Sequence, residues 1–194
     1  MIWPNETSFD SIFRPASEQH AVPLSILKGV TAKESSFNPR ASKHEPHVKD
    51  TSRGLMQVLY STAKWIGFKG TEEELFDPAK VIPVGAAVLK RFFDMATKTG
   101  GGWEDAVSMY NAGMEKIGTG RYTARKRSDG TFLNQQYVDD VKVYSGYFAG
   151  KIPEETARRY MKTKILDVAI PALMVALIVG IPLLLLYSQP RPAL

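Results

Sequence analysis

The sequence predicts a mainly α-helical domain followed by a C-terminal transmembrane helix. Apolar residues recur at three- and four-residue spacing in several segments before residue 150, which is typical of helices that bury one face. The connections between these segments are short. After Lys164 the chain becomes almost uniformly apolar, which is typical of a segment that crosses a lipid bilayer.

The composition limits the classes of protein that fit this chain. Its 194 residues are enough for one domain of ordinary size and an appendage. It has no cysteine, which excludes disulfide bridges and thiolate metal sites. Its net charge of +5 suits a partner with a negative surface, such as anionic lipid, a carboxylate-bearing cell wall or nucleic acid.

Shifts in composition divide the chain into five parts. The N-terminus has no basic region followed by an apolar stretch, so no cleavable secretory signal is expected. The predicted parts are an irregular N-terminal lead-in with Pro4 and Pro15 (1–20), the globular domain (21–150), a basic juxtamembrane segment (151–164), the transmembrane helix (165–187) and a short tail (188–194).

The first helix of the domain is expected to start at Pro23, because proline lacks the N–H that a first helical turn leaves unpaired. It should end near Ser36, since Asn38 precedes a proline and is disfavoured in the helical region. The residues that share its inner face are Leu27, Val30, Thr31 and Glu34.

The remaining segments follow from capping and turn signals. Thr71 with Glu74 three residues later is typical of a capped helix start, and so is Asp77 before a proline. The expected elements are a polar loop with a possible hairpin (38–53), helices at 55–67, 71–76, 78–99 and 104–112, a basic loop or ribbon (114–132) and a last helix (133–148).

Four short motifs follow one another along the domain. They are Glu34-Ser35-Ser36-Phe37-Asn38-Pro39-Arg40-Ala41, Ser52-Arg53-Gly54-Leu55-Met56-Gln57, Tyr110-Asn111-Ala112-Gly113 and Tyr137-Val138. In this order they resemble the catalytic domain of soluble lytic transglycosylases (SLT), which cleave the glycan strands of bacterial peptidoglycan. The resemblance covers roughly residues 20 to 148 and implies that 21–150 is a catalytic domain with a lysozyme-like fold.

Glu34 is the candidate catalytic residue. It shares the apolar face of its helix and lies near the negative end of the helix dipole, and both effects raise the pKa of a carboxyl group. A general acid that works near neutral pH needs such a shift. The hypothesis is that Glu34 protonates the glycosidic oxygen and then takes a proton from the 6-hydroxyl of the N-acetylmuramyl unit. The product is a 1,6-anhydro end.

The resemblance also implies a set of substrate-binding residues: Ser35, Met56, Gln57, Tyr110, Asn111 and Tyr137. Ser35 is expected to orient Glu34 by a hydrogen bond, and Tyr137 matches the family tyrosine that bonds to the catalytic glutamate. Core packing is the alternative for Met56. Asn134 occupies a position where the family often has a threonine, so a supporting contact is expected to be lost or moved.

A second carboxylate would point to hydrolysis, because most glycosidases use two. Asp50 is the candidate, apart from Glu45. Related goose-type lysozymes have an acid where this chain has Leu59, which favours the one-carboxylate mechanism. No cofactor is expected, and no metal site either, because His44 and His47 lie in a polar loop without further ligands.

The apolar C-terminal segment bears on location. Val168 to Tyr187 is a run of twenty uncharged residues, enough to span a bilayer as a helix; a buried core helix or an amphipathic surface helix is the alternative. The basic residues before it would keep the domain on the cytoplasmic side, or inside a membrane-containing particle, where peptidoglycan is out of reach. The sequence therefore favours a virion-associated protein that is delivered to the host envelope, with secretion or conjugation machinery, or a folded domain that does not follow the charge rule, as the alternatives.

The leading prediction is a peptidoglycan lytic transglycosylase that cleaves the MurNAc-GlcNAc β-1,4 bond for local wall penetration during phage genome entry. Its expected partners are glycan strands, a lipid bilayer through 165–187, and virion or secretion-machinery proteins. The alternatives are a hydrolytic lysozyme, a glycan-binding protein without catalysis, and a nucleic-acid binder that uses Arg121, Arg125, Lys126 and Arg127. No base-stacking motif accompanies that basic run, which disfavours nucleic acid.

Overall fold

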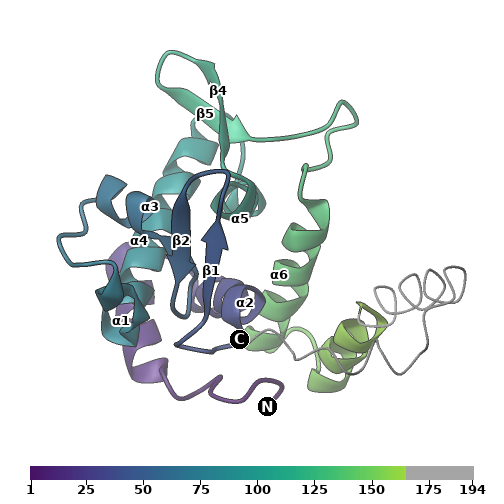
Figure 1. Ribbon diagram of the computed structural model, residues 1–194. Coiled ribbons are helices and arrows are strands. Elements are labelled where there is room, and N and C mark those ends of the chain that lie inside the picture. Colours follow the sequence, from purple (N-terminus) through teal and green to yellow (C-terminus); the bar gives the residue numbers. More distant parts are fainter. Residues whose placement is uncertain (165–194) are drawn as a thin grey trace, which may run out of the picture.

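Helix α2 (Leu24–Ser35) lies at the centre of the domain and packs mainly against α6 (Gln135–Phe148) (Figure 1). Every residue from Leu27 to Ala32 is buried, so α2 is covered on all sides. Gly29 permits the close approach of α6, because a Cβ at that position would lie 2.3 Å from the Ser145 Oγ. The predicted helix from Pro23 to about Ser36 is confirmed.

The computed structural model describes residues 1–164. The predicted transmembrane helix (165–187) and tail (188–194) lie outside the described residues. Within residues 1–164, none of the helices combines the length and the apolar character that a membrane span requires. The mainly helical character predicted for the domain is confirmed.

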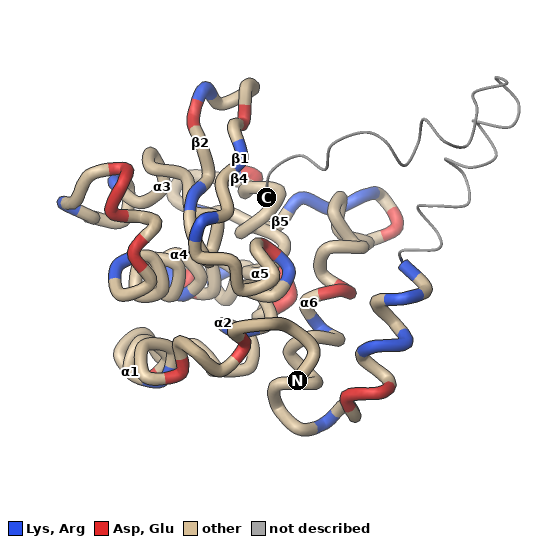
Figure 2. The backbone as a smooth tube through the Cα atoms, turned by 60° about the horizontal axis from the view of Figure 1, so that its bottom comes forward, with Lys and Arg blue, Asp and Glu red and all other residues tan. Residues whose placement is uncertain are grey.

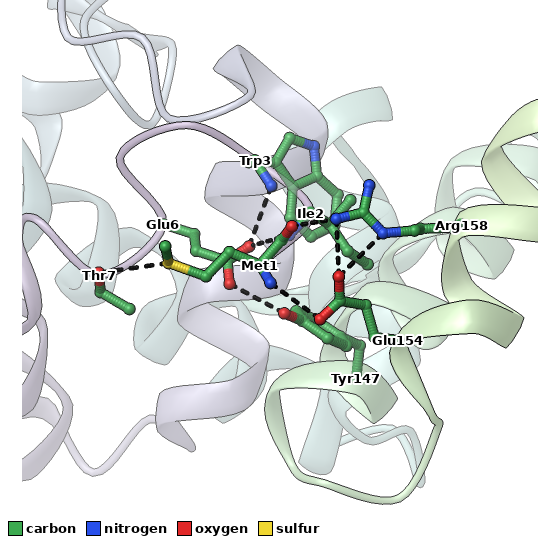
Figure 3. A network of polar contacts seen from close by, with 8 residues as sticks. All are labelled: Met1, Ile2, Trp3, Glu6, Thr7, Tyr147, Glu154 and Arg158. Atoms are coloured by element: carbon green, nitrogen blue, oxygen red, sulfur yellow. Dashed lines mark hydrogen bonds and ion pairs between the residues drawn. The ribbon is translucent and has the colours of Figure 1, made fainter.

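The N-terminal residues are more ordered than predicted. The prediction of an irregular segment is wrong for helix α1 (Asp10–His20), which contains Pro15 and buries Phe13 and Ala16 against α4. Before α1, the Glu6 carboxylate accepts hydrogen bonds from the backbone N–H groups of Ile2 and Trp3 and from the Tyr147 hydroxyl (Figure 3). Trp3 is 4% exposed and belongs to the core. Tertiary packing therefore outweighs the helix-breaking tendency of proline here.

A small antiparallel sheet follows α2 in the chain and packs against α3 (Tyr60–Trp65) and α4. Its strands β1 (Ser42–Glu45), β2 (Asp50–Arg53) and β3 (Val58–Leu59) pair in that order. The hairpin expected as a possibility within 38–53 is therefore present. The helix predicted for 55–67 is wrong at its start: only α3 (Tyr60–Trp65) is α-helical.

A long helix forms another part of the core. Helix α4 (Pro78–Thr97) starts as predicted, since the Asp77 carboxylate accepts a hydrogen bond of 2.8 Å from the Ala79 N–H. The turn before it is a 3-10 helix, η1 (Glu73–Phe76). Helix α5 (Trp103–Ala112) packs against both α4 and α6. These elements confirm the expected helices near 71–76, 78–99 and 104–112.

The basic segment 114–132 begins with a second hairpin, β4 (Met114–Gly118) and β5 (Arg121–Ala124), which projects from the domain above α5 (Figure 1). Beyond α6, residues 154–164 are helical. This last helix is joined to α6 by the Tyr160–Asp140 and Lys164–Gln136 hydrogen bonds. Toward residue 164 the charged residues of this helix are basic, and Figure 2 draws them in blue.

Candidate active site

Glu34 lies in the last turn of α2 and faces a cleft. Ser36 ends the helix in the left-handed conformation, with φ of 52°. The cleft has a volume of about 310 Å³. Its walls come from α2, the three strands β1 to β3 with the turns between them, and the end of α5: Glu34, Lys43, Glu45, His47, Ser52, Gln57, Leu59, Tyr110 and Asn111.

The Glu34 carboxyl is poised to hold a proton near neutral pH. Burial raises its pKa from 4.5 to about 7, against the opposing effects of the Tyr137 hydrogen bond and the positive charges of Lys33 and Lys43. The negative charge of Glu45 adds to the rise. A carboxyl with this pKa exists in both protonation states at neutral pH, which is what a group that first donates and then accepts a proton requires.

Two tyrosines donate hydrogen bonds at the site, one to the Glu34 carboxyl and one to the backbone of the cleft. The Tyr137 hydroxyl, from the first turn of α6, donates a hydrogen bond of 2.5 Å to Glu34 Oε1. The Tyr110 hydroxyl, from α5, donates at 2.8 Å to the Met56 carbonyl. Burial and the nearby Glu34 charge place the pKa of both tyrosines well above the usual range, so both remain neutral donors.

Ser35 and Met56 stabilise the cleft from behind. The Ser35 hydroxyl donates to the Leu55 carbonyl at 2.7 Å, so it ties α2 to the turn before β3 and bonds to backbone rather than to the Glu34 carboxyl. The Met56 side chain is fully buried, and a Cβ at Gly85 of α4 would lie 2.3 Å from its sulfur. The structure therefore supports the alternative of core packing for Met56.

Gln57 lines the cleft and is fixed in place by its own hydrogen bonds. Its amide nitrogen donates to the carbonyls of Ala41 and Gly54, at 2.8 and 3.0 Å, and its amide oxygen accepts from the Ser52 hydroxyl at 2.9 Å. Its backbone has a φ of 47°. The side chain therefore joins β2 and the loop after α2 at the wall of the cleft.

Asn111 is oriented by a residue that the sequence marked only as a departure from the family pattern. The Asn134 amide nitrogen donates to Asn111 Oδ1 at 3.0 Å and to the Ser108 carbonyl at 3.1 Å. The Ser108 hydroxyl completes the set by donating to Asn134 Oδ1. A supporting contact is therefore present in another form, and it holds Asn111 at the wall of the cleft.

The acid that shares the cleft with Glu34 is Glu45 and not Asp50. Asp50 accepts hydrogen bonds from the backbone N–H groups of Thr51 and Ser61, which helps to lower its pKa, and it lines a separate hollow beside Lys64. Glu45 forms an ion pair of 2.8 Å with Lys43. Strand alternation places residues 43 and 45 on one face, so recognition of the strand would have identified Glu45 from sequence.

Two residues of the basic run have structural partners. Arg127 donates to the Phe132 and Leu133 carbonyls and so closes the loop before α6. Lys126 forms an ion pair of 2.8 Å with Asp105. Arg125 lines a second hollow that shares Gln57 and the 110–111 pair with the Glu34 cleft. These contacts weaken the nucleic-acid alternative, because half of the proposed basic surface is engaged within the domain.

Metal-binding side chains do not gather in the described part of the chain: within residues 1–164, no group of three or more histidine and acidic side chains could hold an ion. The His44 ring instead lies 3.2 Å from the Thr51 hydroxyl, and the His47 ring lies 3.8 Å from Glu45.

Comparison with known proteins gives matches that include lytic transglycosylases. The model of the transglycosylase SLT domain matches residues 11–133. Membrane-bound lytic murein transglycosylase C of Histophilus somni is 30% identical over 113 residues, which are 53% of this chain and 30% of that protein. Peptidoglycan transglycosylase gp16 of Escherichia phage T7 is 25% identical over 133 residues, 67% of this chain and 10% of that protein. This chain thus spans less than a third of either relative.

A solved structure shares the fold. The lytic transglycosylase Slt of Pseudomonas aeruginosa superposes with a TM-score of 0.55 and 20% identity, over 78% of this chain and 25% of that one. The likeness shows that the described domain has the mainly helical, lysozyme-like fold. The matched region of the family model begins inside α1, in agreement with the ordered N-terminal part of the domain.

Proposed function

The chain belongs to the transglycosylase SLT domain family, and we propose that it is a peptidoglycan lytic transglycosylase with Glu34 as its acid–base residue. One observation carries the proposal: the carboxyl of Glu34 lies in a cleft, has a pKa of about 7, and accepts a hydrogen bond from Tyr137. The names of the relatives, which describe transglycosylases of murein and peptidoglycan, agree with it.

The proposed reaction moves one proton out and one proton back. Protonated Glu34 gives its proton to the oxygen of the β-1,4 bond between MurNAc and GlcNAc, and the bond from C1 of MurNAc to that oxygen breaks. The acetamido group of MurNAc stabilises the positive charge at C1. The Glu34 carboxylate then takes the proton of the 6-hydroxyl, whose oxygen bonds to C1. Glu34 is again protonated, the product is a 1,6-anhydro end, and no water is consumed.

The other cleft residues have positioning and binding roles in this proposal. Tyr137 holds one carboxyl oxygen, so that the other is directed to the substrate. Asn111 presents an amide group at the wall of the cleft, where sugar hydroxyl and acetamido groups would lie, and Gln57 fixes the position of the neighbouring wall through its own hydrogen bonds. Tyr110 contributes its ring to the same wall. Ser35 joins the turn before β3 to α2, and the Met56 carbonyl joins the same turn to Tyr110 of α5.

The presence of Glu45 in the cleft favours one alternative, a hydrolytic lysozyme. Hydrolysis by two carboxylates needs the second acid to activate water or to attack the sugar. The ion pair with Lys43 competes with both roles, because it occupies a carboxylate oxygen at 2.8 Å. In this alternative, Glu45→Gln would abolish cleavage; in the transglycosylase it changes the rate only moderately.

The biological role that we propose is local penetration of the cell wall during phage genome entry, with the chain held at a membrane through residues 165–187. The likeness to a phage transglycosylase supports the phage part, and the uncharged run in the sequence supports the anchor. The proposed location is a virion, with secretion or conjugation machinery as the alternative. Glycan strands, lipid and virion proteins are the proposed partners.

The experiment that tests the function is digestion of purified peptidoglycan sacculi by the full-length protein, with soluble muropeptides measured by chromatography. We expect release by the wild type and a loss of at least about 1,000-fold in Glu34→Gln, because the acid is removed while the shape is kept. Glu18→Gln is the matched control, since Glu18 is an exposed acid on α1. No release by the wild type, or equal release by Glu34→Gln, would contradict the proposal.

A further inference from the structure

Asp140 is a buried carboxylate with no part in the cleft. It lies in the second turn of α6 and is 4% exposed. Three donors surround it: the Lys33 ammonium at 2.6 Å, the Gln136 amide at 2.8 Å and the Tyr160 hydroxyl at 2.7 Å. We call these four residues the Asp140 cluster. A buried charge is costly unless it is paired and hydrogen-bonded, and this one is both.

Two members of the cluster are direct sequence neighbours of residues in the candidate active site. Lys33 directly precedes Glu34 on α2, and Gln136 directly precedes Tyr137, which bonds to Glu34. The Lys33 side chain is about one third exposed, so its position is set by the ion pair rather than by burial. A positive charge at this place favours the ionised form of Glu34.

Other charged and titratable groups also face Glu34. Lys43 and Glu45 come from β1, His47 from the turn after it, Tyr110 from α5 and Tyr137 from α6. Lys43 has its own acidic partner, Glu45, at 2.8 Å. Both ammonium groups near Glu34 are therefore paired with a carboxylate. The two pairs differ in burial, since Asp140 is buried and Glu45 lines the open cleft.

We propose that Asp140 is a positioning residue for Glu34: its carboxylate binds the Lys33 ammonium, so that this positive charge stabilises ionised Glu34 less than an unpaired ammonium would. An ion pair acts on a third charge as a dipole, whose effect falls off faster with distance than that of a single charge. Asp140 thereby preserves the rise in pKa that burial gives to Glu34. The consequence for catalysis rests on the proposed role of Glu34 as the acid.

The cluster also links the last described helix to the site. Tyr160 belongs to the helical segment 154–164, and Lys164 of the same segment donates to the Gln136 amide oxygen at 2.8 Å. The segment therefore completes the shell of Asp140 from outside the core of the domain. It follows that 154–164 is part of the catalytic unit and not only a connection to the residues that follow.

The test is a titration that needs no turnover. Full-length protein in detergent is prepared with glutamate carboxyls labelled for carbon NMR, and the Glu34 signal is assigned by its absence in Glu34→Gln. Titration midpoints are then compared for the wild type, Asp140→Asn, Lys33→Met and the double variant. Glu104→Gln is the control, because it frees the ammonium of Lys142 in an exposed pair of 2.9 Å outside the cluster.

We expect Asp140→Asn to lower the Glu34 midpoint by about half to one pH unit, because the Lys33 charge is no longer balanced. Lys33→Met should raise it, the double variant should lie near the wild type, and Glu104→Gln should not change it. An unchanged midpoint in Asp140→Asn, or an equal fall in the double variant, would overturn the proposal.

Two further measurements test the same effect of Asp140 on Glu34. If Asp140→Asn does not fold, Lys33→Met is compared with the double variant: a higher midpoint in Lys33→Met supports the proposal, and equal midpoints overturn it. The basic limb of the pH–rate profile for muropeptide release should move with the midpoint. Absence of turnover in the wild type would contradict the proposed function and leave the titration result standing.

Discussion

At the scale of single residues, two requirements on the Glu34 carboxyl conflict. Its carboxyl faces the cleft to meet substrate, and its burial raises its pKa to about 7. Folding therefore removes a carboxylate from water at neutral pH, which costs free energy. Glu34 therefore lowers the free energy of unfolding of the domain at neutral pH.

This conflict predicts how stability depends on pH. Below pH 4.5 both states are protonated; between 4.5 and about 7 only the folded state keeps the proton, so stability falls as pH rises through that window. Glu34→Gln has no such loss. We expect it to be more stable than the wild type above pH 7, by on the order of 1–3 kcal/mol, and equal below pH 4.5. Urea unfolding at several pH values measures this; a pH-independent difference would contradict it.

A second prediction at this scale concerns Asn134. Its amide orients Asn111 and also bonds to Ser108. Asn134→Ala should therefore lower kcat/KM for sacculi about tenfold, corresponding to about 1.4 kcal/mol of lost positioning. A double-mutant cycle with Asn111→Ala checks the route: non-additive losses are expected. Additive losses would mean that Asn134 acts through the fold of α5 alone.

At the scale of elements, the turn from Gly54 to Gln57 determines the shape of the cleft. Gly54 has a φ of 71°, and Gln57 has a φ of 47°. These two left-handed residues prevent the helix that the apolar pattern of 55–67 predicts, and they start β3 instead. Local periodicity could not reveal this, because the side-chain bonds that hold Gln57 come from Ser52 and Ala41. The starts of α2 after Pro23 and of α4 after Asp77 depend on local residues and were predictable.

The turn gives a glycine prediction with an internal control. A Cβ at Gly54 would lie 2.0 Å from the Leu75 carbonyl oxygen, whereas one at Gly130, with a φ of 85°, would meet nothing within 4 Å. Gly130→Ala should cost about 1 kcal/mol for the backbone alone. Gly54→Ala should cost at least about 3 kcal/mol more and should distort the cleft. Thermal unfolding compares the two; equal losses would contradict the close packing.

Another prediction at this scale belongs to the segment 154–164. Tyr160→Phe removes one of the three donors to buried Asp140. We expect a loss of about 1–2 kcal/mol in the free energy of unfolding, because the carboxylate keeps its charge with fewer partners. Tyr122→Phe on the exposed hairpin is a conservative control. Native-state hydrogen exchange should show faster exchange in 154–164, and unchanged exchange there would contradict the role of Tyr160.

At the scale of the whole molecule, the first nine residues close the domain. Trp3 contacts the rings of Phe37, Tyr144, Tyr147 and Phe148, with centroids 5.0 to 6.1 Å apart. Figure 3 shows how the same segment meets Glu154 and Arg158 of the last described helix. Both ends of the described chain therefore lie together. Contacts between residues so distant in sequence have no local signal, which is why an irregular lead-in was expected.

Trp3→Ala should therefore destabilise the domain by about 3–5 kcal/mol, since it empties a large buried site. Trp65→Ala is the control, because Trp65 is 45% exposed and should cost much less. Calorimetry of both variants measures the difference. Similar melting temperatures for the two would mean that residues 1–9 are not an integral part of the core.

The motifs predicted the residues that line the cleft better than they predicted the partners of those residues. Glu34, Gln57, Tyr110 and Asn111, from three of the four motifs, line one cleft, and Tyr137 of the fourth motif bonds to Glu34. Glu45 was considered only as the other nearby acid and Asn134 only as a departure from the family pattern, because their contacts depend on a strand face and on hydrogen bonds between α5 and the loop before α6. Sequence order identifies motif residues, but the partners that orient them depend on tertiary contacts.

The most direct test of the central claim is product analysis by mass spectrometry after digestion of sacculi in heavy-oxygen water. With Glu34 as the single acid and base, the wild type should form 1,6-anhydro-MurNAc ends that contain no heavy oxygen, and Glu34→Gln should form none. Reducing MurNAc ends that carry heavy oxygen would contradict the account. They would show that water attacks the sugar and would direct attention to Glu45 as a second catalytic carboxylate.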